Sequence, residues 1–149
     1  MNEIAINRTW SIGCGSFSLL VIVLLTWAAV SELQYRNWLS ALDARARTFH
    51  GHVYNGRRDS STHVMISANS HETNDDHVPE IVAMTKECIL SASVTNLTVD
   101  LSGASISDKS IKELSQMSGL DTLDLRNTGM TQPVVAELRT NLRGTVIKH

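Results

Sequence analysis

A repeat of 24 residues in the last third of the chain constrains its fold more than any other feature of the sequence. The tripeptide Val99-Asp100-Leu101 recurs as Leu123-Asp124-Leu125, an offset of 123 minus 99, or 24 residues. The same offset pairs further apolar positions: Ile106 with Met130, and Leu114 with Leu138. Each copy reads as a short strand followed by a helical segment, and one such unit is too thin to bury its own apolar face. The sequence therefore predicts stacked units in an α/β domain with a short parallel sheet.

The alternation within each strand predicts which side chains face the core and which face outward. Val99 and Leu101 point inward, as do Leu123 and Leu125 in the next copy. A last strand is expected at residues 146–148. The outward face is formed by one residue of that strand and by the residues between and beside the inward ones: Thr98, Asp100, Ser102, Thr122, Asp124, Arg126 and Lys148. Repeat proteins usually bind partners through such a surface, so this face is the candidate partner-binding site.

The two copies also resemble a known family. Residues 97–108 read LTVDLSGASISD and residues 119–128 read GLDTLDLRNT, which is similar to the LxxLDLSGTxITD type of bacterial leucine-rich repeat. Residues 138–148 are similar to the terminal half-unit of that family. Short bacterial members with an N-terminal transmembrane anchor, a linking helix and a degenerate first repeat share the whole layout. The resemblance assigns residues 96–149 to leucine-rich-repeat-like units.

Two positions depart from the family pattern. Asn96 stands where Leu120 stands in the next unit, and Gln132-Pro133 replaces the expected Asp-x-Gly opening of the helix. Asp108 is the expected N-cap of the first repeat helix and Thr131 that of the second, because short oxygen-bearing side chains accept from the first helical N–H groups.

Residues 11–31 are predicted to form a transmembrane helix that follows a tail of residues 1–10. No charged residue occurs between Thr9 and Ser31, and twenty residues of helix span roughly 30 Å, the thickness of a bilayer core. Trp10 and Trp27 fit the aromatic positions at the two membrane interfaces. The segment therefore predicts a single-pass membrane protein that contacts lipid through residues 11–31.

Two alternatives to a permanent anchor stay open. A cleaved signal peptide would use Ala29-Val30-Ser31 as its cut site, although the apolar run is longer than an ordinary signal core. A buried core helix is the other alternative, and a run of this length beside so small a domain disfavours it. Arg8 precedes the run and several arginines follow it, so the positive-inside rule only slightly favours a cytoplasmic C-terminal part, and a signal-anchor would place that part outside.

Residues 32–49 show the spacing of an amphipathic helix that ends before Gly51. Its apolar stripe recurs at helical intervals: Tyr35, Trp38, Leu39, Leu42, Ala46 and Phe49. This stripe could cap the following domain, pack against a second copy of the chain, or lie along the lipid surface. We favour the cap, because the first layer of the domain needs a cover.

Residues 50–95 are predicted to be a degenerate first repeat with a polar loop. Short strands are expected at residues 52–54 and 63–66, separated by a turn at Asn55-Gly56. The polar run at residues 69–76 reads as an exposed loop. Pro79 fits the first turn of a helix that continues to Cys88, which reads as a small buried residue.

The sequence offers little support for catalysis, for a cofactor or for a nucleic-acid partner. A net charge of −2 without a basic stripe disfavours nucleic acid. Five of the six histidines lie between His50 and His77, but no zinc-ligand spacing such as HExxH follows. Asp100 and Asp124 fall on adjacent predicted strands, yet the repeat family carries Asp there routinely. We therefore expect no enzyme, no bound metal and no cofactor.

These observations predict a membrane-anchored leucine-rich-repeat domain that mediates protein–protein interaction through its outward face. The alternative is a structural protein that self-associates through its membrane-proximal helix, with Tyr35, Trp38, Leu39 and Leu42 as the interface.

Overall fold

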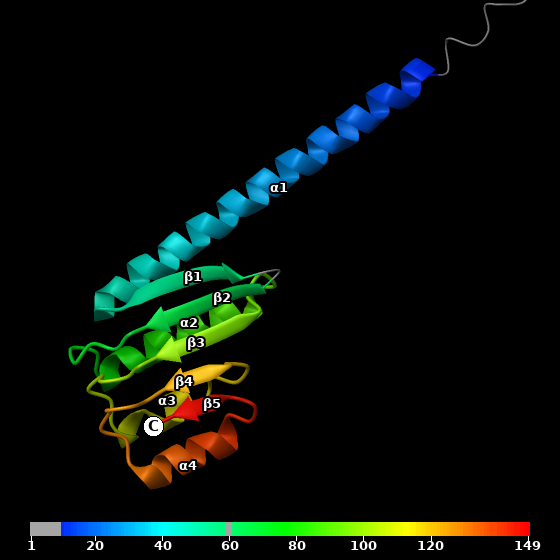
Figure 1. Cartoon of the computed structure of the whole chain (residues 1–149). Helices are drawn as coiled ribbons and strands as arrows, with labels where there is room; N and C mark the ends of the chain where they lie inside the picture. Colours follow the sequence, from blue (N-terminus) through cyan, green and yellow to red (C-terminus); the bar gives the residue numbers. More distant parts are fainter. Residues whose placement is uncertain (1–9, 59–60) are drawn as a thin grey trace, which may run out of the picture. The chain divides into compact units, whose positions relative to one another are not determined.

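A computed structural model of the chain describes the backbone of residues 10–58 and 61–149, and the side chains of residues 20–56 and 61–149 (Figure 1). The chain divides into two compact units, Met1–Trp38 and Leu39–His149. The predicted tail lies outside the described residues, apart from Trp10, which begins the first helix.

The first helix, α1 (Trp10–Ala46), runs without interruption through the boundary between the two units. The segments at residues 11–31 and 32–49 thus continue into one another as a single helix up to Ala46, because neither Pro nor Gly interrupts residues 16–46. Among the residues described, no helix is both long and apolar enough to cross a membrane. The side chains of residues 11–19, the first part of the predicted span, lie outside the described residues.

The second unit is built on a mixed sheet of five strands in the order β1-β2-β3-β4-β5 (Figure 1). The strands are β1 (His52–Arg58), β2 (Ser61–Ser67), β3 (Asn96–Asp100), β4 (Thr122–Asp124) and β5 (Val146–Lys148). The α-helices that follow them are α2 (Val78–Leu90), α3 (Ile111–Leu114) and α4 (Gln132–Asn141). Single turns of 3-10 helix occur at η1 (Arg47–Phe49), η2 (Asp75–His77) and η3 (Asp108–Ser110). β1 pairs antiparallel with β2 and the other pairs are parallel, so the sheet is mostly, and not wholly, parallel.

The structure confirms the stacking of the 24-residue units. Val99 pairs with Leu123 across β3 and β4, and Leu123 pairs with Ile147 across β4 and β5. The apolar side chains that recur in the two copies are buried: Val99, Leu101, Ile106, Leu114, Leu123, Leu125, Met130 and Leu138. The hydrophobic core therefore extends from one 24-residue repeat to the next, and α2 and α3 lie behind the sheet (Figure 1).

The prediction of a turn at Asn55-Gly56 is wrong. Both residues lie within β1, where Asn55 pairs with Val64 and Gly56 with His63. The ladder continues until Arg58 pairs with Ser61. A turn at the predicted place would leave the first half of β2 unpaired along the edge that faces β1.

The predicted loop at residues 69–76 is only partly exposed. Thr73 is fully buried and donates its hydroxyl to the carbonyl oxygen of Phe49, at 2.8 Å. The helix that follows the loop begins at Val78, confirming a helix start near Pro79, and Cys88 is buried as expected.

The end of α1 covers the first layer of the second unit, as the apolar stripe predicts. Leu42, Ala46 and Phe49 are buried in the core of this unit. Polar contacts hold the same segment: Arg45 bonds both Glu80 (2.8 Å) and Glu87 (2.7 Å) of α2, and the Val53 N–H donates to Asp43 (2.9 Å). The hydrogen bond from Val53 on β1 to Asp43 thus ties the end of α1 to the edge strand of the sheet. The helical segment formed by α1 and η1 ends at Phe49, before Gly51, as predicted.

Replacing Gly51 by alanine is expected to destabilise the second unit by about 1–3 kcal/mol, the range for overpacking. A Cβ at this position would lie 2.7 Å from a ring carbon of Phe49 and 2.7 Å from the backbone oxygen of Ser67. The matched control is Gly56→Ala in β1, where a Cβ would meet nothing within 4 Å. Urea titration of the full chain followed by circular dichroism measures both, and equal costs for the two variants would contradict the close packing at Gly51.

Candidate binding face

Two rows of side chains cross the sheet on the face opposite to the buried residues. Strand register places the first row in the order His52, Ser67, Asp100, Asp124 and Lys148. The second row is Tyr54, Met65, Thr98, Thr122 and Val146. The structure therefore brings all the predicted outward residues of the strands onto one face, and Ser102 and Arg126 lie two positions after the last residues of β3 and β4. We call this surface the outward face.

The members of these rows on β1 and β2, and Val146 on β5, were not predicted to belong to the outward face. Tyr54 and Val146 are the most open apolar side chains of the second row, at 53% and 59% exposed. Short strands were expected at residues 52–54 and 63–66, and the alternation within them is the signal that could have placed their outward residues on this face. A long insertion hid it, because the paired residues Ile66 and Val99 are separated by 33 positions (99 minus 66) and not by 24.

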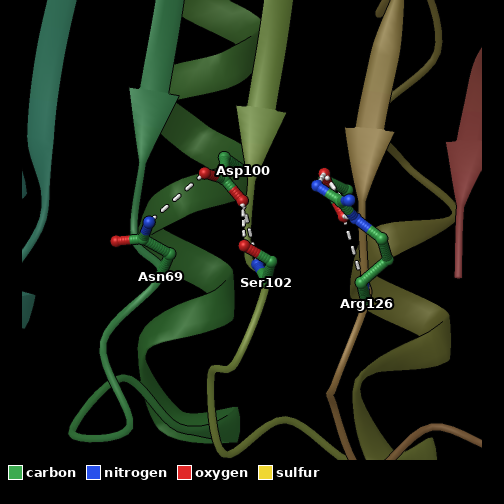
Figure 2. Close-up of polar contacts among 5 residues, drawn as sticks. Asn69, Asp100, Ser102 and Arg126 are labelled. Atoms are coloured by element: carbon green, nitrogen blue, oxygen red, sulfur yellow. Dashed lines mark hydrogen bonds and ion pairs between the residues drawn. The ribbon is translucent and has the colours of Figure 1, made fainter.

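Asp124 lies on the outward face but is only 5% exposed, because Arg126 folds back over it. The guanidinium donates from Nε to Oδ1 at 2.9 Å and from Nη2 to Oδ2 at 2.7 Å (Figure 2). These hydrogen bonds from Arg126 hold the pKa of the Asp124 carboxyl below its ordinary value despite burial, and Lys148 adds its positive charge. The same contacts raise the pKa of Arg126. Asp124 therefore presents a neutralised pair to a partner and not an open carboxylate.

Asp100 occupies the equivalent position in the preceding unit with different neighbours. Its Oδ1 accepts from the Ser102 N–H at 3.0 Å and from the Ser102 hydroxyl at 2.7 Å, and its Oδ2 accepts from the Asn69 amide at 3.3 Å (Figure 2). Within the described part of the chain, Asp100 forms no ion pair. Ser102 stands where the next repeat has Arg126. It orients the Asp100 carboxylate by hydrogen bonds but leaves it only half-buried.

Carboxylates at the starts of η2 and η3 each bond to the repeat unit that follows. The Asp75 carboxylate accepts from the N–H and hydroxyl of Ser107, at 2.9 and 2.6 Å, and from the Ser110 hydroxyl at 2.5 Å. One unit later, Asp108 accepts from the N–H and hydroxyl of Thr131, both at 2.8 Å. These bonds fix the register in which the outward residues line up.

The predicted N-cap at Asp108 is therefore wrong in its role. Ser107 is the N-cap of η3 and accepts from the Lys109 N–H, whereas the Asp108 side chain reaches the next unit. Thr131 does occupy the N-cap position of α4, but its hydroxyl donates to Asp108 instead of capping the helix. Contacts between units outweigh local capping at both positions.

The histidines and the cysteine serve local contacts. His50 lies 2.9 Å from Glu72, and His77 accepts the Asn74 N–H at its Nδ1 atom. Within residues 20–56 and 61–149, no group of three His, Cys, Asp or Glu side chains converges as metal ligands. Burial raises the pKa of the Cys88 thiol to about 11, so this cysteine is a poor nucleophile at neutral pH.

Comparison with known proteins adds no family to these observations. No protein-family model, no curated protein and no solved structure matches the chain.

Proposed function

We propose that this chain is a single-pass, membrane-anchored domain of the leucine-rich-repeat type that binds another protein through its outward face. The observation that carries the proposal is the register of the sheet, which aligns polar and apolar side chains from all five strands on one surface. A face built from stacked units is a rigid and extended platform, which suits a protein partner better than a small molecule.

The repeat type is supported by the geometry of the units. Each has a short strand, an inward apolar ladder and a helix, and Asp75 and Asp108 each bond to the unit that follows.

The anchor is supported by the apolar surface of α1. The side chains of residues 20–25 are all exposed, and Trp27 is 71% exposed. A helix that is apolar on every side is found inside a membrane or inside a larger protein core. The uncharged sequence of residues 11–30 favours the membrane.

The alternative function, self-association through the stripe of the membrane-proximal helix, loses part of its interface. Leu42, one of the four proposed contact residues, is 1% exposed within the core of the second unit. The rings of Tyr35 and Trp38, in the first unit, face each other at a tilt of 35° with their centroids 5.7 Å apart. The remaining stripe is short, and we favour the outward face as the interaction surface.

A set of changes on the outward face is expected to weaken partner binding about tenfold while the fold is kept. The variant carries Asp100→Lys and Thr122→Arg and keeps Lys148, so that the face becomes positive over β3, β4 and β5. It leaves Asp124 intact because a lysine there would bury a cation beside Arg126. Full chains in nanodiscs are used to capture proteins from membrane extracts, with quantitative mass spectrometry. We expect at least one protein captured by the wild type to fall about tenfold, since central interface residues carry most of the binding energy.

The matched control places the equivalent changes on the helices: Glu113→Lys on α3 and Thr140→Arg on α4. It should capture the same proteins as the wild type. If every protein captured by the wild type is also captured equally by the outward-face variant, this surface is not the binding site.

A further inference from the structure

The outward face has an ordered distribution of charge across its last three strands. Asp100 on β3 and Lys148 on β5 form no ion pair among the described residues, whereas Asp124 between them is paired with Arg126. Arg126 and Lys148 both act electrostatically on Asp124, and Asp100 acts on Arg126. The face is therefore negative over β3, neutral over β4 and positive over β5.

The neighbouring row adds an uncharged contact surface beside these charges. Thr98 and Thr122 lie next to Asp100 and Asp124 on the same side of their strands and are half-buried. Val146 continues the row on β5 and is exposed. A partner that meets both charges would therefore also place small apolar groups against this row.

We infer that the partner segment recognised by the outward face carries one basic and one acidic side chain on the same side, matched to Asp100 and Lys148. This inference rests on the proposed function, because it names the chemistry of the partner for the same face. Two strand spacings of about 4.8 Å separate β3 from β5, so the two charges stand roughly 10 Å apart. In a polyproline II segment, residues three apart lie on the same side at roughly 9 Å, which matches this spacing. The expected motif is basic-x-x-acidic, in either chain direction.

The neutral pair between the two charges contributes to the selectivity. Because the carboxylate of Asp124 is already paired with Arg126, a second basic residue in the partner finds no unpaired carboxylate on β4. That residue would instead be repelled by Lys148 on β5. A segment with two basic residues, or with two acidic ones, leaves one charge on the face opposed by a like charge. Mixed-charge segments are therefore preferred to either uniform type.

The test measures short fluorescent proline-rich peptides against the full chain in nanodiscs by fluorescence anisotropy. The peptides carry the motif Arg-x-x-Glu, Arg-x-x-Arg, Glu-x-x-Glu or Gln-x-x-Gln. The wild type should prefer the mixed-charge peptide, Asp100→Lys should prefer the acidic one, and Lys148→Glu should prefer the basic one. Each mismatched charge should weaken binding about fivefold, and the preferences should shrink at high salt.

The control is the charge exchange Lys112→Glu with Glu113→Lys on α3, which should keep the wild-type ranking. The inference is overturned if the wild type binds none of the peptides, if the ranking is unchanged by the variants, or if sedimentation shows that a second copy of the chain occupies the face. The two proposals can fail separately. If the outward-face variant described above captures less of a partner protein but the peptides all bind with the same affinity, the proposed function stands and only the inferred chemistry of the partner is wrong.

Discussion

Replacing Phe49 by alanine is expected to lower the free energy of unfolding of the second unit by about 3–5 kcal/mol, the range for deleting a buried aromatic side chain. Phe49 is 1% exposed and ends the segment that covers the first layer of the sheet. Its carbonyl oxygen also accepts the Thr73 hydroxyl, so the cap is tied to the loop before α2. Urea titration of the full chain in detergent, followed by circular dichroism, measures the change.

Tyr54→Ala is the matched control, because Tyr54 is also an aromatic residue close in sequence but is 53% exposed on β1. Its loss should cost well under half as much. Equal destabilisation by the two variants would mean that the cap is not an integral part of the core.

Replacing Asp75 by alanine is expected to destabilise the stacked units by about 3 kcal/mol, because it leaves partly buried donors of Ser107 and Ser110 without their charged acceptor. The neighbouring Asp76 is the matched control, since its side chain is exposed and Asp76→Ala removes only a weak helix-terminus interaction. The same urea titration measures both variants. A cost for Asp75→Ala no larger than that for Asp76→Ala would contradict the role of Asp75 as the link between units.

The contribution of Asp75 should also depend on pH in a defined direction. Burial alone would raise the pKa of this carboxyl, but the hydrogen bonds from Ser107 and Ser110 and the charge of Lys109 outweigh it, so the pKa lies below its ordinary value. A carboxyl with a lowered folded-state pKa stabilises the fold above its unfolded pKa of about 4, and that stabilisation is lost as the pH falls through the folded value. The difference in stability between the wild type and Asp75→Ala should therefore be full at pH 7 and shrink below about pH 4.

The repeat and the strand alternation predicted the C-terminal part of the fold well, because they are local patterns. Val99, Leu101, Leu123 and Leu125 are buried where the period of two places them inward. The register between neighbouring units followed from the same offset, since Asp100 pairs with Asp124 in the sheet. The preceding unit was harder to predict because its insertion breaks the 24-residue spacing.

The outward face was only partly predictable from the sequence. Strand alternation selected Thr98, Asp100, Thr122, Asp124 and Lys148, and each lies on that face. Alternation gives no information on whether a side chain is covered by a neighbour. The burial of Asp124 under Arg126, and the openness of Asp100 beside Ser102, depend on how these side chains fold back at the strand ends.

By itself, the sequence determined the periodic elements: the apolar segment of α1, the amphipathic stripe that ends at Phe49, and the stacked units with their inward ladders. Only the tertiary structure decided that β1 pairs antiparallel with β2 along its whole length, that Asp75 serves Ser107, and which charges of the outward face stay open. The physical reason is sequence separation. A helical or strand period is read from neighbouring residues, whereas Asp75 and Ser107 are 32 residues apart and meet only after the units have stacked.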